Sequence, residues 1–128
     1  MQEALPAGMR ALVTAMLRAG DPASPHARRR AIEAARGAGA ESYDDQALDT
    51  DLARPAEAGR AKIAALAGQL QVHAREWYLA ELIRIALADG PLTSAERAAA
   101  EHLAAGLGLT QAQTTGVITL TEQGAGQS

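Results

Sequence analysis

The segment that decides the fold is residues 75–110, REWYLAELIRIALADGPLTSAERAAAEHLAAGLGLT. Its first half is apolar on most sides, which is typical of a helix in the middle of a bundle. Gly90 and Pro91 stop that helix, and Thr93 followed three residues later by Glu96 forms a capping-box pattern for the next one. The segment therefore predicts two helices that meet at a sharp corner.

Glycine, proline and capping residues divide the whole chain in the same way. Ser24 is a good N-cap and Pro25 suits a first helical position. Ser42 is expected to cap a short third helix, and Pro55 to open a fourth that ends near residues 68–73. The third helix is expected to span about residues 43–53, and the other helices about residues 6–19, 25–37, 72–88, 94–107 and 110–120.

These elements predict an all-α fold, a bundle of six to seven helices. We expect one domain over residues 1–121 and a disordered tail over residues 122–128. Alanine accounts for 32 of the 128 residues, so the helix interfaces are expected to be close and thin. Trp77 and Tyr78 lie on the most apolar helix, which favours the core for both, with a partner groove as the alternative.

The expected elements repeat after a shift of 69 residues. Residues 82–110 align with residues 13–41, and both stretches contain an apolar helix, a Gly/Asp/Pro turn, a Ser/Thr cap and a second helix. Two interpretations stay open. The chain either contains a duplicated helical hairpin, or two alanine-rich hairpins resemble each other by chance.

The composition excludes several classes of function. The net charge is −3, whereas nucleic-acid binders usually carry a basic field, so no nucleic-acid partner is expected. The absence of cysteine excludes disulfides and thiolate chemistry. The longest apolar stretch, residues 77–88, is short and contains Glu81 and Arg84, so no transmembrane segment is expected. No signal peptide is visible, and we expect a soluble cytoplasmic protein.

Residues 75–110 also carry a family resemblance. The apolar helix ends in Ala88-Asp89-Gly90, Glu96 follows near the start of the next helix, and that helix ends in Leu107-Gly108-Leu109-Thr110. In these features the segment resembles the tellurite-resistance TerB-like domain.

The resemblance implies about seven helices, no enzymatic activity and a link to tellurite or other chemical stress in bacteria. It also implies a duplicated acidic motif that binds a metal ion. The first copy departs from this pattern, because Gly20-Asp21 stands in reversed order and Ala27 occupies the position that corresponds to Glu96.

Asp89, Glu96 and Asp21 are the candidate metal ligands. Carboxylates at turns suit hard divalent cations such as Ca²⁺, which need six or more oxygen ligands, so backbone carbonyls and waters would complete the shell. The alternative is structural, since Glu96 closes a capping box and Asp89 can bond turn amides. The first functional hypothesis is therefore a metal-responsive binding module.

The second hypothesis is a metal-free protein-interaction domain of the co-chaperone or adaptor type. Its partner is expected to be another protein of unknown identity, and self-association as a homo-oligomer stays open. The acidic stretch 41–51 is a solvated face, a second metal site or a dock for a basic partner, and a solvated face is favoured over a metal site. The arginines at 28–30 favour a solvated basic face. Three separated histidines do not predict a zinc site, and no catalytic motif was found.

Overall fold

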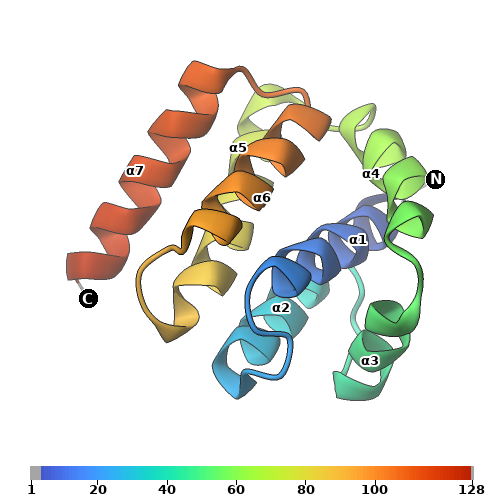
Figure 1. The fold of residues 1–128 in the computed structure, drawn as a ribbon. Coiled ribbons are helices and arrows are strands. Elements are labelled where there is room, and N and C mark those ends of the chain that lie inside the picture. Colours follow the sequence, from blue (N-terminus) through green and yellow to red (C-terminus); the bar gives the residue numbers. More distant parts are fainter. Residues whose placement is uncertain (1–3, 128) are drawn as a thin grey trace.

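The structure is a computed structural model, and it describes residues 4–127 of the chain. This part contains seven α-helices, two short 3-10 helices and no β-strand (Figure 1), which confirms the prediction of an all-α bundle. No helix within it combines the length and the apolar composition needed to cross a membrane. The elements are α1 (Ala4–Ala19), α2 (Pro25–Gly37), α3 (Asp45–Ala53), η1 (Ala56–Gly59), α4 (Arg60–Ala67), α5 (Val72–Ala86), η2 (Leu87–Asp89), α6 (Ser94–Gly106) and α7 (Gln111–Gln127).

Helices α1 and α5 form the centre of the bundle. Helix α1 packs against α2, α3, α4, α5 and α6, whereas α5 packs against α1, α2, α6 and α7. Figure 1 shows α7 at one edge of the molecule and α3 and α4 at the opposite edge. The sequence analysis correctly placed the 72–88 helix inside the bundle but did not single out α1. Large fully buried side chains on these two helices include Met9, Leu12, Met16, Leu17, Leu79, Leu82, Ile83 and Ile85.

The inner face of α2 is made of alanine. Ala27, Ala31, Ala34 and Ala35 are all buried there, so α2 approaches its neighbours closely and buries little apolar area per residue. The predicted cap at Ser24 is confirmed, because its side chain accepts a hydrogen bond from the backbone N–H of Ala27. The thin interface expected from the alanine content is therefore present at this helix.

Two predicted helix starts need correction. Asp44, not Ser42, caps α3, and its Oδ1 accepts from the backbone N–H of Ala47 at 2.9 Å. Both residue types are good caps, but the chain turns at residues 40–43, where the N–H of Tyr43 bonds the carbonyl of Ala40, so regular helix begins later. Pro55 opens the 3-10 helix η1, and α4 itself starts only at Arg60.

Trp77 is not a core residue, in contrast to the prediction, since 43% of it is exposed. Positions 77, 81 and 84 follow one another at i, i+4 and i+7 and share one face of α5. Glu81 and Arg84 form an ion pair on that face, which is the wet side of the helix. Tyr78 faces the interior and is buried, as expected.

The C-terminal prediction also differs from the structure. Helix α7 continues to Gln127 instead of ending near residue 120, so residues 122–127, expected to belong to a disordered tail, are helical. The segment contains no proline to stop the helix, and Glu122 forms an ion pair with Arg97 of α6 at 3.1 Å. Ser128, the last residue of the expected tail, lies outside the described residues.

Candidate functional site

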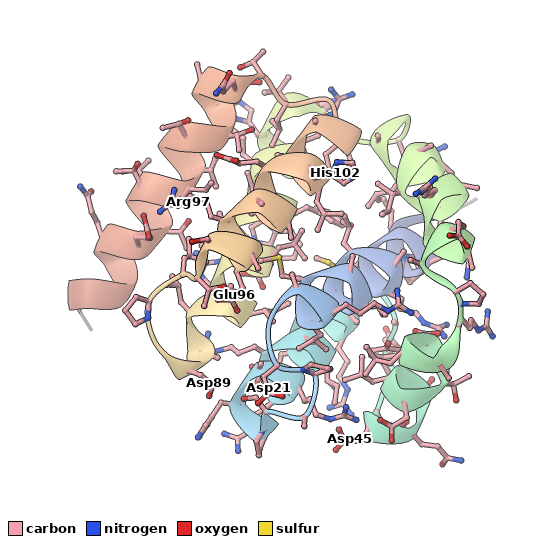
Figure 2. The ribbon with its side chains drawn as sticks, viewed as in Figure 1. Asp21, Asp45, Asp89, Glu96, Arg97 and His102 are labelled. Carbon is pink, nitrogen blue, oxygen red and sulfur yellow. The ribbon has the colours of Figure 1, made fainter. Side chains whose placement is uncertain are left out.

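The two corners identified in the sequence meet in the structure. The hydroxyl of Ser24, at the α1–α2 corner, donates a hydrogen bond to the carboxylate of Asp89 at the α5–α6 corner. Glu96 also approaches the first corner, because a Cβ added to Gly20 would lie 2.5 Å from its Oε2. Figure 2 places Asp21, Asp89 and Glu96 toward the same end of the molecule. A larger residue at position 20 would therefore displace the Glu96 carboxylate from its present place.

Each of Asp21, Asp89 and Glu96, together called the corner carboxylates below, already has a structural partner. Asp21 Oδ1 accepts from the backbone N–H of Ala23 at 2.9 Å, and Asp89 is bonded by Ser24 as described. Glu96 and Thr93 form the predicted capping box, with bonds of 3.0 and 3.1 Å.

The corner carboxylates do not gather into one ligand set. Within residues 4–127, no three His, Cys, Asp or Glu side chains are grouped so that they could hold a metal ion. Gly20 and Ala27, which correspond by the 69-residue shift to Asp89 and Glu96, supply no acid from the first hairpin. The metal hypothesis therefore stays a prediction from the sequence.

A groove that sequence reasoning missed runs along the outer face of α1. It has a volume of about 320 Å³ and is bordered by α1, the end of α3, η1, α4 and α6. Its floor contains the small or apolar side chains of Ala7, Ala11, Ala15, Ile63 and Leu103. Its polar border carries Arg10, Arg18, Arg54, Arg60, Lys62 and His102.

One carboxylate, that of Asp51, lines the groove, and it accepts hydrogen bonds from two neighbouring side chains. Asp51 is 9% exposed and accepts two hydrogen bonds of 3.0 Å from the guanidinium of Arg10. It also accepts one of 2.7 Å from the hydroxyl of Tyr43. The guanidinium of Arg10 lies 5.1 Å from the centre of the Tyr43 ring as well. This triad fastens α3 and the loop before it to α1.

The triad changes the titration of its members. Burial acts to raise the pKa of Asp51, but the hydrogen bonds from Arg10 and Tyr43 and the charge of Arg10 outweigh it, so this pKa lies below its usual value. Burial and the hydrogen bond to Asp51 raise the pKa of Tyr43. At neutral pH the carboxylate is therefore ionised and the phenol is protonated.

Arg18 is also occupied, although not by an acid. Its Nη2 donates to the backbone carbonyls of Asp51, Leu52 and Arg54 at 3.1, 3.1 and 2.6 Å. These are carbonyls at the C-terminal end of α3, where a cation is favourable. By contrast, no ion pair between described residues involves Arg54, Arg60 or Lys62.

The acidic stretch 41–51 was only partly understood from the sequence. Asp51 was included in a solvated face, but the structure buries it, because the position faces α1 and Arg10 supplies a counter-charge. Asp45 and Asp49 remain exposed and bind Arg28 of α2 at 3.1 and 2.7 Å. The one available signal was the spacing of Asp51 from Leu48 on the buried side of a helix.

Comparison of the chain with protein-family models, with curated proteins and with solved structures gave no match. The resemblance to TerB-like domains therefore stays a prediction from the residues quoted for the segment 75–110.

Proposed function

We propose that this protein is a non-enzymatic, TerB-like binding module that holds a partner in the groove along α1. The observation that carries the proposal is the combination of an apolar floor with a cationic border at one concave surface. Its volume of about 320 Å³ falls within the range of roughly 300–1,000 Å³ typical of ligand sites. The proposed link to chemical stress in bacteria follows from the family resemblance alone.

The chemistry of the groove supports binding over catalysis. Asp51 is held as an ionised acceptor by Arg10 and Tyr43, so it serves as an anchor and is poorly placed to take a proton from a substrate. His102 makes no hydrogen bond with another side chain in the described part of the protein, and the groove lining contains no cysteine or serine. The hydroxyl of Thr14, which also lines the groove, donates to the backbone carbonyl of Arg10, so it is not paired with a base.

The metal-free form of the module is the one that the hydrogen bonds favour. To share one cation, the corner carboxylates would have to move toward one another, because they do not form a ligand group within residues 4–127. That movement would disturb their bonds to the amide of Ala23, to the hydroxyl of Ser24 and within the capping box of α6. Binding at the groove needs no such rearrangement.

Titration with Nile red, a neutral apolar dye, tests whether the groove takes a ligand. We expect dye fluorescence to rise and the backbone amide resonances of Ala7, Ala11 and Ala15 to shift. Ala15→Leu, which fills the groove, should weaken dye binding, whereas Ala112→Leu on the exposed side of α7 is the matched control. Equal dye binding by both variants, or resonance shifts only elsewhere, would remove the site from the proposed function.

A further inference from the structure

Resting on the proposed function, we infer that the groove along α1 binds an acidic amphipathic helix of a partner protein. Three features lead to this partner chemistry: the charge of the border, the shape and length of the floor, and the absence of a sheet edge.

The charge at the groove is opposite in sign to that of the whole protein. The chain has 12 Lys and Arg and 15 Asp and Glu, yet five of the former and one of the latter line the groove. Glu57 of η1 is exposed but is not part of the lining. A local excess of cations on an acidic protein attracts an anionic partner and repels a cationic one.

Three of the five cations are available for recognition. Arg10 is held by Asp51, and Arg18 is held by carbonyls of α3, so both contribute mainly to the fold. Arg54, Arg60 and Lys62 are exposed and form no ion pair among the described residues. They follow one another along the α3–η1–α4 side of the groove, so acidic side chains of the partner belong on that side.

The floor suits the apolar face of a helix. Ala7, Ala11 and Ala15 occupy one face of α1 at i, i+4 and i+8, and their short side chains allow a second helix to approach closely. The groove follows α1 from Ala7 to Arg18, which at 1.5 Å per residue is roughly 16 Å, or about three helical turns. Apolar residues at i, i+3, i+4 and i+7 of the partner cover about two of these three turns.

An extended peptide has no equivalent site. Strand addition requires an exposed sheet edge with free backbone groups. Residues 4–127 contain no β-strand, so they offer no sheet edge that would pair the backbone groups of a bound peptide. A helix pairs these groups internally.

Three fluorescein-labelled peptides of 18 residues test the inference by fluorescence anisotropy at low salt. All three peptides carry leucine at i, i+3, i+4 and i+7 and share the same alanine positions. They differ only at the remaining positions, which are all glutamate in the first peptide, all glutamine in the second and all lysine in the third. We expect the glutamate peptide to bind about tenfold tighter than the glutamine peptide, and the lysine peptide to bind weakest. Salt should reduce the advantage of the glutamate peptide.

A charge-reversed protein provides the second arm. Arg54→Glu/Arg60→Glu/Lys62→Glu should abolish the preference for the glutamate peptide. These side chains are exposed, so circular dichroism should show an unchanged helical content. Arg29→Glu, an exposed arginine of α2 outside the groove, is the matched control and should retain the preference.

The outcomes separate this inference from the proposed function. Nile red binding in the groove without any preference among the peptides overturns the acidic-helix inference and leaves the binding module intact. Failure of both dye and peptides overturns both. Displacement of the dye by dodecanoate but not by the glutamate peptide assigns the groove to a small carboxylate amphiphile and overturns the inference. Self-association that the triple variant abolishes assigns it to a second copy, with the same consequence.

Discussion

Replacement of Asp51 by alanine should destabilise the protein by about 3 kcal/mol. Asp51 accepts hydrogen bonds from both Arg10 and Tyr43 and links α3 to α1. Its removal leaves the Tyr43 hydroxyl without an acceptor in a residue that is 3% exposed, at a cost of about 2 kcal/mol. The lost bonds to Arg10 add only about 1 kcal/mol, because that side chain is 38% exposed and regains water.

The magnitude is measured by urea unfolding followed by circular dichroism at pH 7 and 25 °C. Tyr43→Phe alone removes the hydroxyl together with its bond and should cost about 1 kcal/mol. The double variant should fall at least about 1 kcal/mol short of the sum of the two single effects, because phenylalanine leaves no hydroxyl to strand. Asp49→Ala on the same helix, whose ion pair is exposed, should change stability by under about 0.5 kcal/mol.

The contribution of Asp51 should also depend on pH. Its pKa is lowered in the folded protein, so the stabilisation is present above the unfolded value of about 3.9 and is lost as pH falls through the folded pKa. The stability difference between the wild type and Asp51→Ala should hold from pH 7 to pH 5 and shrink below about pH 4. Strict additivity of the two substitutions, or a loss under about 1 kcal/mol for Asp51→Ala, would refute the reasoning.

Three further predictions concern the corners and the last helix. Ser24→Ala should lower the free energy of unfolding by about 1–2 kcal/mol in the same assay, because it removes the cap of α2 and the bond to Asp89; an unchanged value would mean that water replaces both bonds. Gly116→Ala should raise that free energy by roughly 0.5–1 kcal/mol, since a Cβ at this position of α7 meets no atom within 4 Å; destabilisation would contradict the placement of α7. Addition of Ca²⁺ should leave the melting temperature unchanged, because the corner carboxylates do not form a ligand group within residues 4–127; a rise that Asp89→Asn abolishes would instead support the metal-responsive module.

The spacing of residues close in sequence correctly predicted the helix caps at the two corners. The capping box of Thr93 and Glu96 was predicted and is confirmed by both of its hydrogen bonds. The Ser24 cap is confirmed as well, and Thr110 and Gln113 exchange hydrogen bonds of 2.8 and 3.1 Å in the same pattern at the start of α7. A cap and its partner lie within one helical turn, so their relation is readable from spacing alone.

Contacts between segments that are far apart in the sequence could not be predicted from residue spacing. Asp51 meets Arg10 across 41 positions of sequence, and nothing in the acidic stretch distinguishes it from the exposed Asp49 except which helix face turns inward. For the same reason, Trp77 was wrongly predicted to lie in the core. A helix with apolar residues on several faces does not reveal from its sequence which face the neighbours leave open.

The sequence by itself determined the helical character of this chain, the approximate bounds of most helices and the turns that join them. These properties follow from the alanine content, the capping residues and the helix-breaking glycine and proline residues. The tertiary structure decided which charges were buried, which cations were left without an acid, and where a groove remained. Those properties arise from how α1, α3, η1, α4 and α6 are placed around one another, and long-range packing is set by the fit of whole helix surfaces.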